Sequence, residues 1–199
     1  MKIVCIGDSL TYGYGVDPFD SWVSVVRRGT GLDIINKGIN GDTTEGMLYR
    51  FDMDVISKNP DRVFVMGGSN DLIMNIEPSL VESNITAMCR LSVDKSIEPI
   101  IGIPPNVDIG NVREDWANYS DFSMVAERLA KYRQRLLRYS RISGVKHLDF
   151  YSEIEKRAIN GIGGLYFDGL HFNEMGHRIM ADIFYSFLMN NPPRCSKIK

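Results

Sequence analysis

The chain has 199 residues, of which 44% are hydrophobic and 24% charged, and its formal net charge is −2. This length suits one sizeable domain, and the slight negative charge argues against a nucleic-acid-binding protein, which carries a basic surface. No apolar stretch approaches the ~18 residues that span a bilayer, so we predict no membrane span. Cys5, Cys89 and Cys195 show no paired spacing. They indicate thiols in a reducing compartment, and we predict a cytoplasmic protein.

Five short apolar runs recur along the chain with helical stretches between them. The runs are KIVCIG (2–7), LDIINKG (32–38), RVFVMGG (62–68), PIIGIPP (99–105) and VKHLDF (145–150). Several are apolar almost throughout, which is typical of strands buried on both faces of a parallel sheet. The predicted helices cover 20–30, 43–58, 77–96, 121–142, 152–159 and 174–189. This alternation predicts an α/β protein, a three-layer α/β/α fold with a five-stranded parallel sheet and right-handed crossovers.

The sequence predicts a single domain over residues 1–190. Two prolines follow the last predicted helix, so we expect a loose tail over 191–199. Residues 105–120 form the longest stretch without clear periodicity. A loop of that length is either a functional rim or lid, or a simple surface insertion, and both interpretations stay open.

Small and polar residues follow the carboxyl ends of the predicted strands. GDSL (7–10) ends the first strand, NGD (40–42) follows the second, and GGSND (67–71) ends the third. Asp168 and His171 lie in a glycine-rich stretch after the fifth strand. In an open parallel sheet, ligands bind beyond the carboxyl ends of the strands. These positions are therefore the candidate functional site.

Ser9 is a candidate nucleophile if a base takes its proton and the base is itself oriented. Of the three histidines, His147 lies in a predicted strand and His177 in the last predicted helix, which leaves His171 as the base. Asp168, three residues earlier in a loop, can reach the imidazole Nδ1 and leave Nε2 to face Ser9. Each residue alone reads as a turn acid or a loop histidine. Together they predict a catalytic triad.

Acyl transfer also needs hydrogen-bond donors aimed at the developing oxyanion. We predict three such donors: the backbone N–H of Ser9, the backbone N–H of Gly41 and the side-chain amide of Asn70. The structural alternatives are a positive-φ turn for Gly41 and a helix cap for Asn70. Asp8 and Asp71 are predicted to support the site, with Asp8 accepting backbone N–H bonds that hold the turn.

At these positions the sequence resembles the GDSL family of esterases and lipases, also called SGNH hydrolases. The family's four blocks appear in order, as Gly7-Asp8-Ser9-Leu10, Asn40-Gly41-Asp42, Gly68-Ser69-Asn70-Asp71 and Asp168-Gly169-Leu170-His171. The resemblance implies a flavodoxin-like fold and hydrolysis of acyl esters without a metal or cofactor. It also implies that Ser9 is the nucleophile, that Asp168 and His171 complete the triad, and that Gly41 and Asn70 hold the oxyanion.

The predicted substrate is a small-molecule carboxylic ester that reacts through an acyl-enzyme. We favour short-chain acyl esters or acetylated carbohydrates, because no long apolar groove is evident. Longer acyl chains, as in a lysophospholipase or a thioesterase, are the alternative. Candidate rim residues are Tyr12, Tyr14, Trp116, Tyr119, Leu165, Tyr166 and Phe167. Packing in the core or on the surface is an equal alternative for each of them.

Two functions of other classes stay open. A carboxylate cluster would bind Mg²⁺ for phosphoryl transfer if the fold brought its members together. Its candidate ligands are Asp8, Asp42, Asp71 and Asp168. The same scaffold would also suit a non-catalytic carbohydrate- or ligand-binding module. The sequence does not set the oligomeric state.

Overall fold

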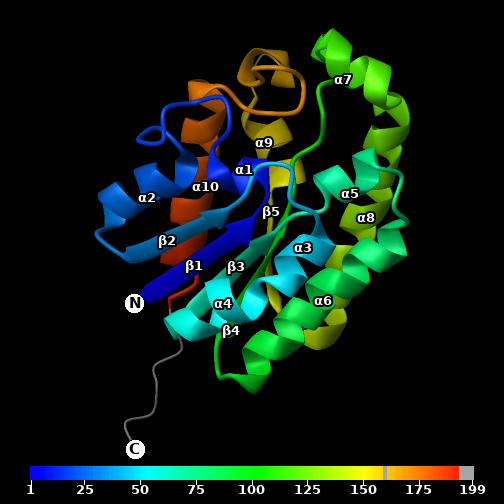
Figure 1. Cartoon of the computed structure of the whole chain (residues 1–199). Helices are drawn as coiled ribbons and strands as arrows, with labels where there is room; N and C mark the ends of the chain where they lie inside the picture. Colours follow the sequence, from blue (N-terminus) through cyan, green and yellow to red (C-terminus); the bar gives the residue numbers. More distant parts are fainter. Residues whose placement is uncertain (159–160, 193–199) are drawn as a thin grey trace, which may run out of the picture.

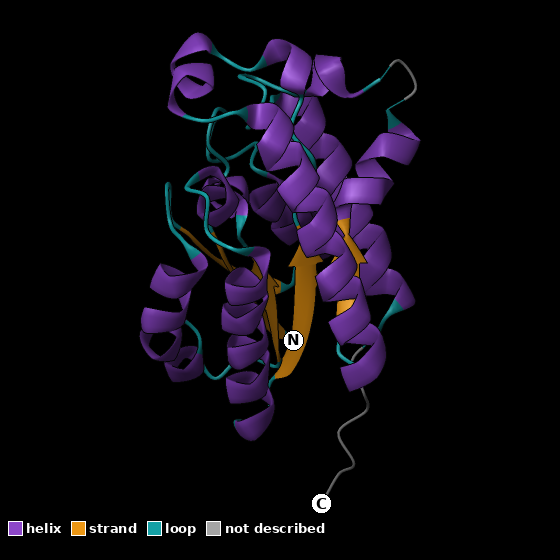
Figure 2. Ribbon diagram, turned by 90° about the vertical axis from the view of Figure 1, so that its right-hand side faces the viewer, coloured by secondary structure: helices purple, strands orange, loops and turns teal. Residues whose placement is uncertain are grey.

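In the computed structural model, which describes residues 1–158 and 161–192, five parallel strands form one sheet with helices on both faces (Figure 1, Figure 2). The strands are β1 (Lys2–Gly7), β2 (Asp33–Gly38), β3 (Arg62–Met66), β4 (Glu98–Ile103) and β5 (Lys146–Asp149). Their order in the sheet is β2-β1-β3-β4-β5. The predicted three-layer fold is thus confirmed. Of the predicted tail, residues 193–199 lie outside the described part.

Helices connect every pair of consecutive strands, as parallel pairing requires. The longer ones are α2 (Trp22–Thr30), α6 (Pro78–Asp94), α8 (Phe122–Ser143), α9 (Phe150–Arg157) and α10 (Glu174–Asn190). The shorter ones are α1 (Ser9–Tyr12), α3 (Thr44–Tyr49), α4 (Phe51–Asp54), α5 (Ser69–Ile73) and α7 (Glu114–Tyr119), with 3₁₀ turns η1 (Ile56–Lys58), η2 (Ile109–Asn111) and η3 (Ile162–Leu165). Figure 1 shows α2, α9 and α10 on one face of the sheet and α3, α4, α6 and α8 on the other.

The central strands are apolar throughout because each lies between two hydrophobic cores. Along β1, Val4 and Ile6 pack into the core under α6 and α8, whereas Ile3 and Cys5 pack into the core under α2 and α10. All four side chains are fully buried. A strand covered on both faces cannot show polar alternation, so the unbroken apolar runs predicted these strands well.

The helix predicted over 43–58 is divided in the structure. Helices α3 and α4 meet at Arg50, whose φ of −91° and ψ of 3° interrupt the helical geometry, and η1 follows. The Arg50 guanidinium donates to Asp42, Asp54 and the Gly7 carbonyl. Apolar periodicity runs through this break, so the pattern could not reveal it. Helices α1, α5 and α7 were also not predicted, because each is six residues or shorter.

The pairing register brings the carboxyl ends of β1, β2 and β3 together. Gly7, the last residue of β1, pairs with Gly38 on one side and Met66 on the other. A Cβ atom at Gly7 would lie 2.1 Å from Thr11 Oγ1 and 2.4 Å from the Met66 carbonyl oxygen. Glycine therefore lets α1 fold back directly over the strand ends. None of the described helices combines the length and apolar character needed to cross a membrane.

Candidate active site

Ser9 is the first residue of α1 and is separated from the end of β1 by Asp8 alone. Asp8 caps this helix, because its Oδ1 accepts the Leu10 N–H at 2.9 Å. The side chain of Ser9 is 6% exposed. As the first helical residue, Ser9 also carries a backbone N–H that the helix itself does not use. The strand-to-helix turn therefore presents a hydroxyl and a backbone donor at the carboxyl edge of the sheet.

Asp168 and His171 lie in a tight loop between η3 and α10. Asp168 Oδ1 accepts the backbone N–H groups of Leu170 at 3.0 Å and His171 at 2.8 Å. Its Oδ2 is 2.8 Å from His171 Nδ1. Gly169, with φ of +84°, supplies the left-handed backbone that this turn requires. The three-residue spacing thus folds the carboxylate onto its own imidazole.

The loop brings His171 to Ser9 although 162 residues separate them. Ser9 Oγ is 2.9 Å from His171 Nε2, and both side chains are buried. Burial raises the pKa of Asp168, but the hydrogen bonds from His171 and Leu170 outweigh it and bring that pKa to about 2. Asp168 is therefore ionised at neutral pH. An ionised Asp168 favours the tautomer with hydrogen on Nδ1, which leaves Nε2 to accept from Ser9.

The two remaining oxyanion candidates are linked to each other through one loop. Asn70, in the first turn of α5, donates an Nδ2 hydrogen to the Asp42 carbonyl at 2.8 Å. The amide has a second hydrogen, which this bond leaves free. Gly41 precedes Asp42 and has φ of +75°. The same loop is tied to β1, since Ile39 N–H donates to the Gly7 carbonyl at 3.0 Å.

A buried polar network supports these loops. Asp71 accepts the backbone N–H and the hydroxyl of Thr44, the latter at 2.6 Å. Arg50 joins Asp42 to the Gly7 carbonyl. The predicted supporting residue Asp71 thus fixes the start of α3. Sequence reasoning did not link Thr44 or Arg50 to the site, because their contacts with Asp71 and Gly7 join segments far apart in the chain.

Asp8 is the least compensated acid in the site. Its Oδ2 is buried and has no hydrogen-bond partner among the described residues. Burial raises the pKa of Asp8 to about 7, and the charges of Asp71 and Asp42 act in the same direction. Burial likewise raises the pKa of Asp71, more than its bonds to Thr44 lower it. The site therefore concentrates negative charge where few cations balance it.

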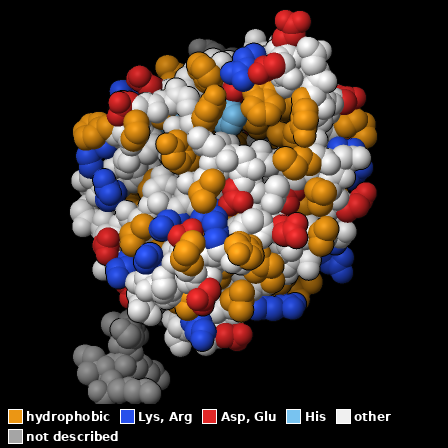
Figure 3. All heavy atoms as spheres, in the orientation of Figure 1, with side chains coloured by type: hydrophobic (Ala, Val, Ile, Leu, Met, Phe, Trp, Pro, Cys, Tyr) orange, Lys and Arg blue, Asp and Glu red, His pale blue; other side chains and the backbone are white. Residues whose placement is uncertain are grey.

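Two of the predicted rim aromatics lie against the imidazole. The ring centroids of Tyr14 and Trp116 are 4.5 Å and 6.2 Å from that of His171. Tyr12, Tyr119 and Phe167 are exposed, whereas Leu165 and Tyr166 are buried in the core, so these last two do not form the rim. Figure 3, in the orientation of Figure 1, shows a histidine side chain in the upper part of the molecule. It lies among hydrophobic side chains and beneath charged side chains.

The other two histidines have structural partners. His147, half-buried on β5, bonds Ser140 Oγ through Nδ1 at 2.7 Å. His177 is buried in α10, and its Nδ1 accepts the Trp22 N–H at 3.3 Å. Burial lowers the pKa of His177 to about 4. Neither histidine therefore replaces His171 as the partner of Ser9.

Three of the four carboxylates predicted as magnesium ligands have separate side-chain partners. Asp168 binds His171, Asp71 binds Thr44, and Asp42 binds Arg50. Across residues 1–158 and 161–192, no three His, Cys, Asp or Glu side chains are arranged to hold a metal ion. A magnesium centre therefore has no ligand cluster in this part of the chain.

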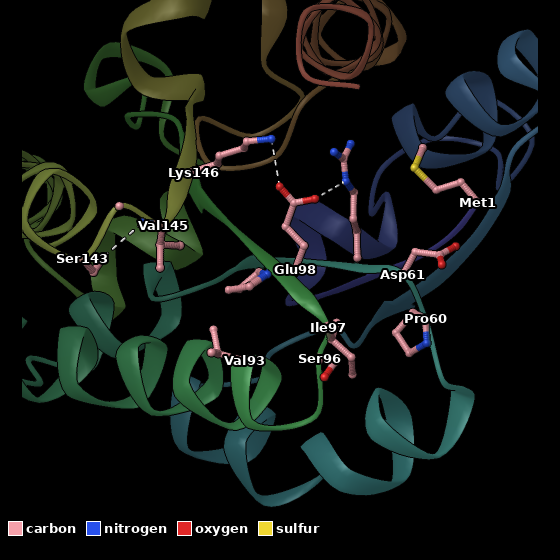
Figure 4. A pocket seen from close by; sticks show the side chains of 13 residues that line it. Met1, Pro60, Asp61, Val93, Ser96, Ile97, Glu98, Ser143, Val145 and Lys146 are labelled. Atoms are coloured by element: carbon pink, nitrogen blue, oxygen red, sulfur yellow. Dashed lines mark hydrogen bonds and ion pairs between the residues drawn. The ribbon is translucent and has the colours of Figure 1, made fainter. Parts of the chain in front are cut away.

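A pocket at the opposite edge of the sheet contains none of the predicted site residues. Figure 4 shows its lining, which includes Glu98 and Lys146 at the amino ends of β4 and β5. Glu98 accepts from Lys146 Nζ and from Arg62 Nε, each at 2.8 Å. The Arg62 Nη1 and Nη2 atoms are buried and have no hydrogen-bond partner among the described residues.

The chain was also compared with known proteins. The model of the GDSL-like Lipase/Acylhydrolase family matches residues 5–179. The chain is 30% identical over 142 residues to an arylesterase of Vibrio mimicus, covering 67% of each protein. It is 26% identical over 164 residues to an acetylxylan esterase of Geobacillus stearothermophilus, covering 77% of this chain and 71% of that protein.

Among solved structures, a member of the lipolytic protein G-D-S-L family from Veillonella parvula shares the fold. Its TM-score is 0.80, over 95% of this chain and 98% of that one, at 24% identity. The family match spans the first and last blocks of the site and nearly all of the sheet. The chain therefore belongs to the GDSL-like lipase/acylhydrolase family and is a carboxylic ester hydrolase.

Proposed function

We propose that this protein is a serine esterase in which Ser9 is the nucleophile, His171 the general base and Asp168 the orienting acid. The observation that carries the proposal is the chain of two short contacts, 2.9 Å from Ser9 Oγ to His171 Nε2 and 2.8 Å from His171 Nδ1 to Asp168. Nucleophile, base and orienting acid in series are what acyl transfer by a hydroxyl requires.

The reaction proceeds in two halves. Neutral His171 takes the Ser9 proton as Oγ bonds to the ester carbonyl carbon. The imidazolium then protonates the leaving alkoxide oxygen as its bond to carbon breaks, which leaves an ester of Ser9. In the second half, His171 takes a proton from water, the water oxygen attacks the acyl carbon, and the acid leaves as Ser9 regains its proton. Asp168 stays ionised and stabilises the imidazolium in both halves.

The oxyanion of each tetrahedral intermediate is held by three donors. These are the Ser9 N–H, the Gly41 N–H and the free hydrogen of the Asn70 amide. The support for this assignment is local: Ser9 begins a helix, and Asn70 is bonded to the loop of Gly41 through Asp42. Donors fixed before the reaction stabilise developing charge without a reorganisation cost.

The proposed substrates are short-chain acyl esters, including acetylated carbohydrates. The aromatic rings of Tyr14 and Trp116 beside His171 suit a sugar face or a small aryl group. The relatives named arylesterase and acetylxylan esterase point the same way. Longer acyl chains remain the alternative, and a series of p-nitrophenyl esters from acetate to palmitate, run beside acetylated xylose and a lysophospholipid, separates the two.

The decisive variant is Ser9→Ala. Hydrolysis of p-nitrophenyl acetate should fall by a factor on the order of 10⁴ or more, and a fluorophosphonate probe should no longer label the protein. The matched control is Ser21→Ala, which removes another buried serine beside a helix start. Retained turnover or labelling in Ser9→Ala, with both variants folded, removes Ser9 from its role. EDTA-sensitive phosphatase activity would instead favour the magnesium alternative.

We also propose the cytoplasm as the location and a single domain over residues 1–190. The cysteine argument for the cytoplasm finds support in two free, buried thiols, Cys5 and Cys89. Cys195 lies outside the described residues. Fractionation of cells that express the tagged protein tests the location.

A further inference from the structure

The segment before α7 is hydrogen-bonded through its backbone to the loop that carries Asp168 and His171, and we call this pair of backbone contacts the clamp. Arg113 N–H donates to the Asp168 carbonyl at 3.1 Å, and Asp108 N–H donates to the Gly169 carbonyl at 2.8 Å. The two backbones approach so closely that a Cβ atom at Gly169 would lie 2.6 Å from Val112 Cα. The 105–120 stretch therefore holds the Asp168 turn.

The Arg113 guanidinium lies beside the outer edge of the Asp168 carboxylate. Its Nε and Nη2 donate to Asp115 at 2.6 and 2.9 Å. Its remaining nitrogen, Nη1, is 3.8 Å from Asp168 Oδ2, the same oxygen that bonds His171 Nδ1. The Arg113 Cζ also lies 5.9 Å from the ring of Trp116. The Arg113 guanidinium is thus a half-exposed positive charge beside the Asp168–His171 pair.

The charges around this pair come from few groups. Asp168 lies on the same loop as His171, and Arg113 with Asp115 face it from the α7 segment. Ser9 and Tyr14 face it from α1 and the turn after it, and Trp116 from α7. His177 on α10 is electrostatically coupled to His171, but burial lowers its pKa to about 4, so it is neutral above that pH.

We propose that Arg113 is a positioning residue of the Asp168–His171 pair: it holds the Asp168 carboxylate in place and keeps the imidazole neutral to lower pH. This inference rests on the proposed triad. A positive charge near the imidazole disfavours a second positive charge there. Arg113 therefore extends the pH range in which His171 acts as a base, and the clamp gives the 105–120 segment a function.

The test is the acidic limb of the pH profile of kcat/KM, which reports the free enzyme. Arg113→Met should move this limb upward by roughly half a pH unit, since the guanidinium is 43% exposed and partly screened by water. Asp115→Asn keeps the cation and removes an acid, so it should move the limb downward by less. In the double variant the midpoint of the acidic limb should lie near that of the wild type. In Arg113→Lys, which keeps the positive charge, the midpoint should also stay close to the wild-type value.

The opposite directions separate charge from structure. Both single variants break the same Arg113–Asp115 pair, so a merely structural role would lower kcat in both without moving the limb. The matched control is Arg135→Met, another half-exposed arginine paired with an acid, Glu82, and it should leave the profile unchanged. An unmoved limb in Arg113→Met, or shifts of the same sign in both single variants, overturns the proposal.

A second measurement needs no turnover. The protonation midpoint of the His171 ring can be followed by NMR in the Ser9→Ala background, with and without Arg113→Met, and the added substitution should raise it. The difference should shrink in 1 M salt, where charges are screened within ~3 Å. If Ser9→Ala remains active, the proposed function fails. If Ser9→Ala is inactive but the midpoint does not move, only the role of Arg113 fails.

Discussion

The two edges of the sheet both bury charged side chains, but they balance them differently. At the amino edge, Glu98 lies between two cations, Arg62 and Lys146, and the three residues begin adjacent strands. Figure 4 shows Glu98 reaching toward Lys146. At the carboxyl edge, Asp8 and Asp71 accept bonds only from backbone N–H groups and a hydroxyl, among the described residues.

This difference matches two different tasks. Opposite charges in register at the amino edge satisfy one another and fix the starts of three strands. At the carboxyl edge, only neutral donors bond Asp8 and Asp71, and burial raises the pKa values of both acids more than these bonds lower them. A site that must stabilise changing charge needs such preorganised polar groups, and it accepts a loss of stability in return.

The first prediction concerns the carboxyl edge, where a substitution should lower activity and leave the fold intact. Asn70→Ala removes a proposed oxyanion donor, so kcat for p-nitrophenyl acetate should fall by ~10²–10³. KM and the fold should change little, because the lost bond to the Asp42 carbonyl is a single one. Steady-state kinetics measure kcat and KM, and circular dichroism checks that the variant is folded. An Asn70→Ala enzyme with full kcat would take Asn70 out of the oxyanion hole.

The second prediction concerns two buried groups with opposite pH dependence. Burial lowers the pKa of His177 to about 4, from ~6.5 in the unfolded chain. The stability that neutral His177 supports is complete above pH ~6.5 and is lost as pH falls toward 4. Burial raises the pKa of Asp8 to about 7, from ~3.9 unfolded. Its contribution is complete below pH ~4 and is lost as pH rises through 7.

The two contributions oppose each other, so each should partly offset the slope that the other gives to the wild-type free energy of unfolding between pH 4 and 7. His177→Gln should expose the Asp8 slope, with stability falling as pH rises, by on the order of 3 kcal/mol. Asp8→Asn should expose the reverse slope, of similar size. Urea unfolding at several pH values measures both. Slopes of the same sign in the two variants would contradict the assignment.

The third prediction concerns the amino edge. Glu98→Ala leaves the buried Arg62 guanidinium without its acid, so the free energy of unfolding should fall by about 2–3 kcal/mol. The kcat of the folded fraction should not change, because Glu98 begins β4 at the edge opposite Ser9. Chemical denaturation beside active-site titration checks both. A large loss of kcat would show that the two edges are coupled.

The smallest expected effect sharpens the same contrast. Arg62→Met removes a guanidinium whose Nη1 and Nη2 have no partner among the described residues, while Glu98 keeps Lys146. Replacing an imperfectly paired buried ion by an apolar side chain is often neutral. The free energy of unfolding should therefore change by less than ~1 kcal/mol. A loss as large as that of Glu98→Ala would mean that Arg62, rather than the acid, organises this edge.

The sheet was predictable from sequence because buried parallel strands leave a clear apolar signal. The predicted 2–7 strand matches β1 residue for residue, and the predicted 174–189 helix differs from α10 by one residue. The predicted pairing of Asp168 with His171 agrees with their geometry, because a three-residue loop spacing limits where the carboxylate can lie. Whether these residues act in catalysis stays a prediction for the variants above.

Other features had no signal in the sequence. Arg50 and Arg113 contact segments far away in the chain. Nothing in the sequence around them distinguishes these arginines from arginines on the solvent-exposed surface. The break between α3 and α4 escaped detection because its apolar spacing continues through Arg50. For Leu165 and Tyr166 the sequence left the rim and the core open, and the structure buries both in the core. The local spacing of apolar residues indicates which segments are buried. Polar contacts between distant segments depend on the folded topology, which this spacing does not give.

The proposed nucleophile, Ser9, follows the first strand, and its proposed base, His171, follows the last, while β1 pairs with strands on both sides. A chain that has formed only β1 and α1 therefore holds the serine without this partner, which the loop after β5 supplies. The proposed triad can form only when the five-stranded sheet is in place, so ester cleavage through it should depend on nearly the whole of the described fold.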